Sequence, residues 1–344
     1  MNRQIFDINS AIRQQILLAM LFLGTACQSP FELVFERMEG ATMGTYYGLV
    51  YQGCGVDQSE IEAKLKSLND AFSTYDPNSE ISVFNRGGAN KPFNVSEYFA
   101  APLEGAAEIW AQTDGALDPT VGPLVDLWGF GPAQGVEDPS ETQQEEVASL
   151  VGWHRLRYQN RILTKDVTGL RLDLSAIAKG YAVDELAKMM SEAGCSNYMV
   201  DIGGEMAVAG KNADGGAWRL GIERPDPDSL GSIQLVLEVS DMSVATSGDY
   251  RNYRVVNGKR VDHVMDPRTS RPADNHVVSA TVVHPEAMYA DGYATAAMVL
   301  GVTAALALAE EQDFALLLMT RTTDDDSTKL HYNSRMESYM VSHP

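Results

Sequence analysis

Residues 173–180, DLSAIAKG, combine a carboxylate, a hydroxyl and a cation where an apolar helical pattern begins. Ser175 is a typical helix N-cap, the residues up to Met190 favour helix, and Gly194 predicts the end of that helix. Lys179 would then lie in the first turn, where the helix dipole disfavours a cation unless an anion binds nearby. Backbone N–H groups at a helix start, with a hydroxyl and an ammonium, are suited to phosphate. A solvent-facing lysine on an ordinary packing helix explains the pattern equally well.

A second pair of polar residues lies near the C-terminal end of the chain. Asp291 and Thr295 are four residues apart in a segment with helical periodicity, so both side chains should lie on one face. A carboxylate and a hydroxyl are hard oxygen ligands, suited to Mg²⁺, which commonly binds one or two carboxylates together with ligand phosphates. Taken alone, the pair is better explained as an aspartate that stabilises the helix start and a threonine that bonds to the helix backbone.

Several other segments place reactive groups beside glycine or proline. Asp118 precedes a proline in a glycine-rich loop, residues 201–205 (DIGGE) place carboxylates around two glycines, and His263 begins HVMDP. His263 could be a catalyst or a structural hydrogen-bond partner. Met43 and Tyr75 supply a thioether and a phenol that could enclose an aromatic ring, although such side chains more often belong to the core.

The elements that must position these groups predict an α+β fold. Helices are expected at 59–72, 95–113, 138–150, 176–190 and 285–300, the last one ended by Gly301. Strands are expected at 43–51, 155–158, 161–163, 198–202, 206–209, 218–223, 233–239, 251–256, 260–265 and 277–283. Asn257-Gly258 predicts a tight hairpin, and the continuously apolar last strand should be central and buried. Residues 73–85 and 115–131 are expected to be irregular. Strands with inserted helices and without regular βαβ alternation favour α+β.

Composition excludes some classes of partner. The chain has 344 residues and is 44% hydrophobic, which is sufficient for one large domain or two smaller ones. Its 26 Lys and Arg against 47 Asp and Glu give a net charge of −21, which argues against nucleic acid as a partner. No CxxC or HExxH motif supports a zinc site. Cys54 and Cys195 could form a disulfide, but the sequence leaves open whether they are close.

The N-terminus has the composition of an export signal. Two arginines precede the apolar run 16–23, which is too short for a permanent membrane span. The small residues before Cys27 resemble a bacterial lipobox, although Gly24 stands where leucine is usual. We expect a signal peptide at 1–26, a lipid on Cys27 and a tether at 27–37. Plain secretion with an unmodified cysteine is the alternative.

The order of nine motifs along residues 38–320 resembles the ApbE family, the FAD:protein FMN transferases. The motifs are MGT, STYD, SxxxxF/N, DGALDPTVGPL, LDLSAIAKGYAVD, DIGGE, TSGDYRNY, HVMDPRTSRP and ADGYATAAMVLG. The resemblance implies an α+β domain at 38–325, with mixed sheets, inserted helices and FAD in a central cleft, followed by a tail at 326–344. It also implies an exported protein on the periplasmic side of the bacterial cell envelope, anchored by lipid to a membrane, with the inner membrane favoured.

The resemblance further implies an enzyme that splits the pyrophosphate of FAD, releases AMP and attaches FMN to a threonine or serine of a partner protein. Partners are expected to be flavin-acceptor subunits of membrane oxidoreductase complexes. By motif position, the residues expected to contact FAD are Met43, Tyr75, Ala116, Leu117, Asp118, Asp173, Lys179 and, through its backbone, Met265. The residues expected to hold Mg²⁺ are Asp291 and Thr295 through their side chains and Ala176 and Ala294 through their carbonyls.

Phosphoryl transfer depends on positioning and on neutralising charge, which are the roles expected for Mg²⁺ and Lys179. The attacking hydroxyl must also lose a proton, for which Asp291, Asp173 and His263 are the candidate bases. Two other functions stay open: an Mg²⁺-dependent FAD pyrophosphatase giving FMN and AMP, and a flavin-binding lipoprotein without turnover. Two residues depart from the family pattern, Gly292 where alanine is common and Ser270 where glycine is common.

Overall fold

The computed structural model describes residues 34–132, 135–136, 138–226, 231–249, 253–256, 259–321 and 327–341. The predicted signal peptide, the lipidation site Cys27 and the turn at Asn257-Gly258 lie outside these residues. The chain from Phe35 onward forms one compact unit.

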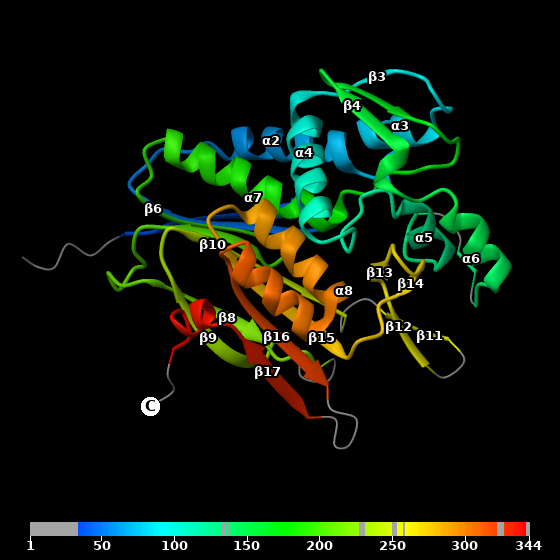
Figure 1. Ribbon diagram of the computed structural model, residues 1–344. Coiled ribbons are helices and arrows are strands. Elements are labelled where there is room, and N and C mark those ends of the chain that lie inside the picture. The colour runs from blue at the N-terminus through cyan, green and yellow to red at the C-terminus, as the bar shows by residue number, and fades with distance from the viewer. Residues whose placement is uncertain are drawn as a thin grey trace, which may run out of the picture. The chain divides into compact units, whose positions relative to one another are not determined.

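An eight-stranded sheet forms the centre of this unit (Figure 1). The order of its strands is β1-β2-β6-β7-β10-β15-β16-β17, and every neighbouring pair is antiparallel. The strands are β1 Glu36–Thr42, β2 Thr45–Gln52, β6 Asn197–Ile202, β7 Glu205–Ala209, β10 Met242–Gly248, β15 Val277–His284, β16 Ala315–Arg321 and β17 Thr328–Tyr332. The expected apolar strand is confirmed as β15, which lies inside the sheet and is buried along nearly its whole length.

Both faces of the sheet are covered, which explains its long apolar runs. On one face, α2 Gln58–Phe72, α7 Ser175–Glu192 and α8 Ala287–Glu311 contact the strands, and α4 Glu97–Gln112 packs on these three helices (Figure 1). The hairpin of β8 Trp218–Glu223 and β9 Ile233–Val239 packs on the other face. In β16, Leu316 and Leu318 therefore join the core beneath the helices, while Leu317 and Met319 join the core beneath the hairpin. The α+β prediction is confirmed.

Smaller elements surround this centre. They are α3 Glu80–Arg86, β3 Phe93–Asn94, α5 Gly122–Leu127, α6 Glu141–Ala148, the 3₁₀ turn Trp153–Arg155, β4 Leu156–Gln159, β5 Ile162–Lys165, β11 Tyr253–Val256, β12 Lys259–Asp262, β13 Met265–Asp266, β14 Arg271–Pro272 and α9 Ser334–Glu337. The prediction that 73–85 and 115–131 are irregular was wrong where α3 and α5 form. Ser79 caps α3 by accepting from the Ser82 N–H, and Phe84 buries one face of this helix.

The strand expected at 43–51 is the second strand of a hairpin, and β1 was not predicted. Met43 and Gly44 form the turn between β1 and β2, and both have positive φ angles, 47° and 74°. Two consecutive positive φ angles are typical of the tight turns that match the twist of a hairpin. Met43 therefore lies at a hairpin tip instead of inside a strand.

The residues expected to form a C-terminal tail belong to the domain. β17 pairs with β16, and Met336 of α9 is completely buried in the core beneath the β8–β9 hairpin. Met340 also bridges to Leu237 of β9. Burial of these apolar residues stabilises the segment against the sheet, so the prediction of a tail was wrong for the described residues 327–341.

The long helix α8 is interrupted at Gly301, where φ is 74° and ψ is 172°. The predicted helix end at this glycine marks a kink, after which helical residues continue to Glu311. Although α8 is long and apolar enough to cross a membrane, most of it is buried within the protein, as expected for a core helix. Asp291 and Thr295 lie before the kink, in the second and third turns.

A disulfide joins Cys54, just after β2, to Cys195, between α7 and β6. The two Cα atoms are 5.1 Å apart, and 141 positions separate the cysteines in the sequence. The pairing that the sequence left open is therefore present. It links the segment after β2 to the segment after the helix that carries Lys179.

Ser270 occupies a left-handed conformation, with φ of 61°, in the turn between β13 and β14. The expectation that this turn favours glycine is confirmed, because left-handed backbone costs a residue with a Cβ about 1 kcal/mol relative to glycine.

Candidate active site

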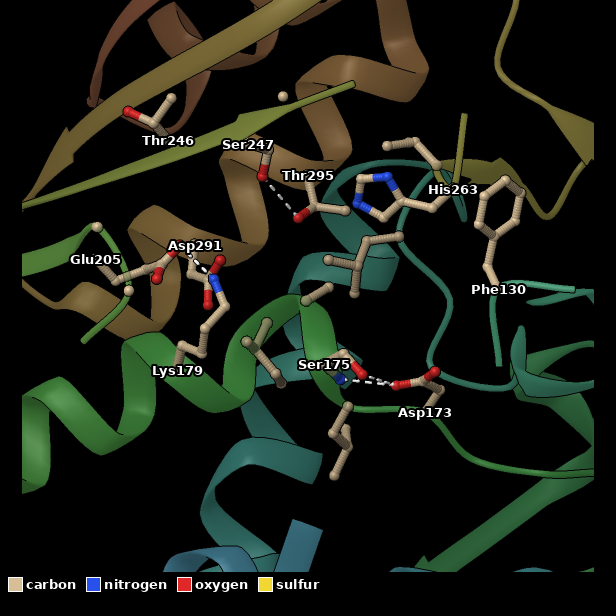
Figure 2. A pocket seen from close by; sticks show the side chains of 18 of the residues that line it. Phe130, Asp173, Ser175, Lys179, Glu205, Thr246, Ser247, His263, Asp291 and Thr295 are labelled. Atoms are coloured by element: carbon tan, nitrogen blue, oxygen red, sulfur yellow. Dashed lines mark hydrogen bonds and ion pairs between the residues drawn. The ribbon is translucent and has the colours of Figure 1, made fainter. Parts of the chain in front are cut away.

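A cavity of about 780 Å³ opens beside the N-terminal turns of α7 and α8. Its walls also include the turn between β6 and β7, the end of β10, strand β8 and the loop before α5. The volume lies within the usual range for small-molecule sites. Figure 2 shows that side chains from these separate elements point into a shared space.

The start of α7 is organised by Asp173. Its Oδ1 accepts hydrogen bonds from the Ser175 backbone N–H, at 2.9 Å, and from the Ser175 hydroxyl. Leu174 is the N-cap residue and makes no side-chain cap, so the prediction that Ser175 is the N-cap was wrong. The longer carboxylate of Asp173 reaches the first backbone N–H instead. Because α7 begins at Ser175, Lys179 lies in its second turn.

Lys179 forms an ion pair with Glu205, whose side chain is 2% exposed. Asp291 from α8 is also buried and faces the same cluster, which therefore contains two carboxylates and one ammonium (Figure 2). Burial raises the pKa of Asp291, whereas the Lys179 ammonium and a hydrogen bond from the Gly180 N–H act to lower that pKa. The cluster joins α7, β7 and α8 at one wall of the cavity.

Two hydrogen-bonded contacts hold α7 against the first two turns of α8. The Gly180 N–H donates to Asp291 Oδ2 at 3.0 Å. One turn further along α7, Asp184 accepts from the N–H groups of Ala287 and Met288, at 2.7 and 2.8 Å. Burial raises the pKa of Asp184 to about 7, although these two donors act to lower it. Asp184 thus satisfies N–H groups at a helix start that has no cap of its own.

We expect Gly180→Ala to lower both stability and activity. A Cβ at this position would lie 2.2 Å from the carbonyl oxygen of Ala287, a backbone atom that cannot move without shifting α8. Such overpacking costs about 1–3 kcal/mol of unfolding free energy. Because α8 carries Asp291, a displacement of about 1 Å should slow turnover about 100-fold. Urea unfolding and turnover measurements check the two effects.

Gly105→Ala is the matched control. This glycine also lies in a helix, α4, and also faces α8, but an added Cβ would meet the flexible end of Met288, with Cε at 2.5 Å. The methionine can rotate away, and alanine favours helix more than glycine does. Equal losses in the two variants would contradict the proposed role of the backbone contact.

Hydroxyl and aromatic groups also line the cavity. Thr295 of α8 shares a hydrogen bond of 3.0 Å with Ser247 of β10. The His263 ring lies 6.3 Å from the ring of Phe130, centroid to centroid, and both rings border the cavity (Figure 2). These groups supply oxygen ligands beside an aromatic surface.

Asp118 orders the loop that precedes α5. One of its oxygens accepts from the N–H and the hydroxyl of Thr120, at 2.8 and 2.6 Å, and the other accepts from the Trp153 N–H at 3.0 Å. These bonds explain how a glycine-rich segment becomes a fixed cavity wall. Ala116 and Leu117 are buried beside it and line the same wall.

Most of the residues predicted for the site line this cavity. They are Tyr75, Ala116, Leu117, Asp118, Asp173, Ala176, Lys179, His263, Met265, Asp291 and Thr295. Two predicted residues do not line it. Met43 packs against the main core from the hairpin tip, and Ala294 is fully buried in α8. Their contacts with FAD and metal stay predictions, as do the roles of the lining residues.

Several lining residues were not predicted as site residues, among them Glu205, Tyr46 and Phe130. Glu205 ends the DIGGE motif, whose carboxylates beside two glycines were a candidate feature, but the motif indicated no role for this side chain. No motif in the sequence points to Tyr46 or Phe130 as site residues, and they line the cavity because of how the chain folds. At Gly292, which departs from the family pattern, an added Cβ would lie 2.4 Å from Ile109 Cδ1, so alanine would require this side chain to shift.

The fold and the cavity together define an α+β protein whose pocket presents a helix start, an ammonium and hard oxygen ligands. The sequence model of the ApbE family matches residues 43–318. The chain therefore belongs to the ApbE family, and the resemblance seen in its motif order is confirmed.

Relatives of known name align with almost the whole chain. A protein of Vibrio cholerae named FAD:protein FMN transferase is 41% identical, with 94% of this chain and 98% of the relative aligned. One from Escherichia coli K12 with the same name is 38% identical, with 89% of each chain aligned. The solved flavin transferase ApbE from V. cholerae superposes with a TM-score of 0.81 at 39% identity, covering 89% of this chain and all of the other. The apo flavinyl transferase ApbE of Pseudomonas stutzeri gives 0.79 at 32% identity, covering 90% and 99%.

Proposed function

We propose that this protein is an Mg²⁺-dependent flavin transferase, which cleaves FAD and attaches FMN to a threonine or serine of an acceptor protein. The oxygen of the acceptor hydroxyl forms a bond to the FMN phosphorus, and the bond from that phosphorus to the bridging oxygen breaks. AMP leaves with the bridging oxygen, and the hydroxyl proton passes to a base. The supporting comparison is the shared family and name of relatives that align over most of the chain.

The observation that carries the proposal is the convergence of Lys179, Asp291 and Thr295 on one cavity. Lys179 comes from the second turn of α7, where the helix dipole adds positive potential, and the other two come from the start of α8. The ammonium, with the positive potential of the helix start, is suited to binding and orienting the pyrophosphate oxygens. The three candidate bases Asp173, His263 and Asp291 all border the same space.

The donor set fits Mg²⁺. The parts of the chain that the structure describes contain no group of three or more His, Cys, Asp or Glu side chains suited to a metal. Asp291 and the Thr295 hydroxyl instead form the small oxygen set that Mg²⁺ combines with ligand phosphates. We infer that these side chains, with the carbonyls of Ala176 and Ala294, hold the ion. When bound, Mg²⁺ offsets phosphate charge and stabilises the departing AMP.

Intact mass spectrometry tests the reaction directly. The soluble form lacking residues 1–27 is mixed with FAD, Mg²⁺ and a purified acceptor domain from a flavin-bearing oxidoreductase subunit. We expect the acceptor to gain the mass of FMN less water, with release of AMP, only when Mg²⁺ is present. Free FMN and AMP with an unmodified acceptor would favour the pyrophosphatase, and intact bound FAD would leave a flavin-binding protein.

We also propose that the protein is exported and anchored at Cys27 on the periplasmic side of the membrane. Its disulfide supports an oxidising compartment, because disulfides rarely persist in the bacterial cytoplasm. Cys27→Ala should move the protein from the membrane fraction to the soluble periplasmic fraction of a bacterial host. A variant that stays with the membrane would contradict the anchor.

A further inference from the structure

Glu205 is held in a fixed position by the turn between β6 and β7. Gly203 and Gly204 have positive φ angles, 62° and 104°. The Gly204 N–H donates to Asp201 Oδ1 at 2.8 Å, and the Gly203 N–H donates to the Tyr46 carbonyl at 3.1 Å. The turn therefore places Glu205 at the first position of β7, directly beside the cavity.

The two oxygens of Glu205 have different surroundings. One of them forms the ion pair with Lys179. The other, Oε2, is buried and has no hydrogen-bond partner among the described residues. A buried carboxylate oxygen without a partner is costly, so its retention requires an explanation.

Lys179 interacts electrostatically with both carboxylates of the cluster. The Lys179 ammonium forms an ion pair with Glu205, and the buried Asp291 carboxylate borders the same part of the cavity. Figure 2 shows the Lys179 nitrogen beside both side chains, with the ion pair drawn to Glu205. Two carboxylates are thus available to one ammonium, which pairs with Glu205.

We propose that Glu205 is a positioning residue that binds the Lys179 ammonium and so keeps the Asp291 carboxylate available for a divalent cation. This inference rests on the proposed function, in which Asp291 holds Mg²⁺. Without Glu205, the ammonium would pair with Asp291, because opposite charges attract strongly where water is excluded. Lysine and Mg²⁺ would then compete for the same carboxylate. Glu205 thus separates the two cations, so that both can act on the pyrophosphate.

Binding of Mn²⁺ alone tests this competition without any flavin. The soluble form is titrated with Mn²⁺, and free Mn²⁺ is followed by electron paramagnetic resonance. We expect Glu205→Gln to weaken Mn²⁺ binding about 10–100-fold, the usual cost of losing a group that orients a metal ligand. The double variant Glu205→Gln/Lys179→Met should recover most of this loss, because the competing ammonium is gone. Lys179→Met alone should bind Mn²⁺ more tightly than the unaltered protein.

Glu185→Gln is the matched control. Glu185 lies on α7 and, like Glu205, pairs with a lysine, Lys64, at 2.7 Å, but it does not line the cavity. Its loss should leave Mn²⁺ affinity unchanged. Glu205→Asp, which keeps the carboxylate, should retain most of the affinity, and circular dichroism confirms that each variant is folded.

Any of four results would overturn the proposal. The first is unaltered Mn²⁺ affinity in Glu205→Gln, and the second is a loss that the double variant does not recover, as expected if Glu205 itself ligates the cation. The third is weaker Mn²⁺ binding, or none, in Lys179→Met, a result that does not depend on how well Glu205→Gln folds. Absence of Mn²⁺ binding by the unaltered protein would count against it equally. FMN transfer, measured separately by mass spectrometry, reports on the proposed function.

Discussion

Asp291→Asn should abolish Mg²⁺-dependent turnover while leaving the fold intact. Asparagine has nearly the same shape and keeps an oxygen that can accept from the Gly180 N–H, but it lacks the charge expected to bind the cation. A metal contributes several kcal/mol to stabilising transition-state charge, so the transfer rate should fall at least about a thousandfold. Intact mass spectrometry of the acceptor over time measures the rate.

Thermal unfolding separates this effect from damage to the fold. Burial raises the pKa of Asp291, so the ionised side chain costs stability at neutral pH in the absence of metal. Asp291→Asn should therefore unfold at the same or a higher temperature than the unaltered protein when no Mg²⁺ is added. Added Mg²⁺ should stabilise the unaltered protein but not the variant. Turnover at the unaltered rate would remove Asp291 from the proposed site.

Loss of the disulfide should give the largest change in stability. Replacing both Cys54 and Cys195 by serine removes a cross-link between positions 141 apart in the sequence. We expect the free energy of unfolding to fall by about 2–5 kcal/mol, chiefly because the unfolded chain gains conformational freedom. Urea unfolding measures the change, and the effect on FAD turnover at low temperature should be small because neither cysteine lines the cavity.

Reduction provides the control for the disulfide. A thiol reductant should lower the stability of the unaltered protein toward that of the double serine variant, and it should leave the variant unchanged. Equal stability of the two proteins under oxidising conditions would contradict a stabilising role for the bond.

Local patterns in the sequence were sufficient to predict the main helices and strands that carry the site residues. Helical periodicity, with glycine as a stop signal, predicted α7 within two residues at each end, and the four-residue spacing of Asp291 and Thr295 correctly placed them together on α8. The uninterrupted apolar run of β15 indicated a strand buried on both faces. Motif order identified the family. Each of these inferences depends on residues near one another in the chain, where sequence spacing directly sets geometry.

Helix caps and the C-terminal segment were less predictable from the sequence, because several residues could form the same hydrogen bonds or contacts. Ser175 and Asp173 are both residue types that cap helices, and in the structure Asp173 accepts from the backbone N–H and the hydroxyl of Ser175. The segment after residue 326 lacked a strong pattern, yet β17 gains stability by pairing with the edge of β16. Which partner a short polar segment finds is decided by the surrounding fold.

The sequence by itself therefore determined the family, the main helices and the chemical types of the site residues. Only the tertiary structure decided that Glu205 of β7 meets Lys179 of α7, that Cys54 joins Cys195, and that Met43 lies outside the cavity lining. The physical reason is that hydrophobic periodicity and helix or strand propensity depend on residues close together in the chain. Contacts between distant segments depend on how the sheet and helices pack, and no local pattern encodes the partner of a single buried charge.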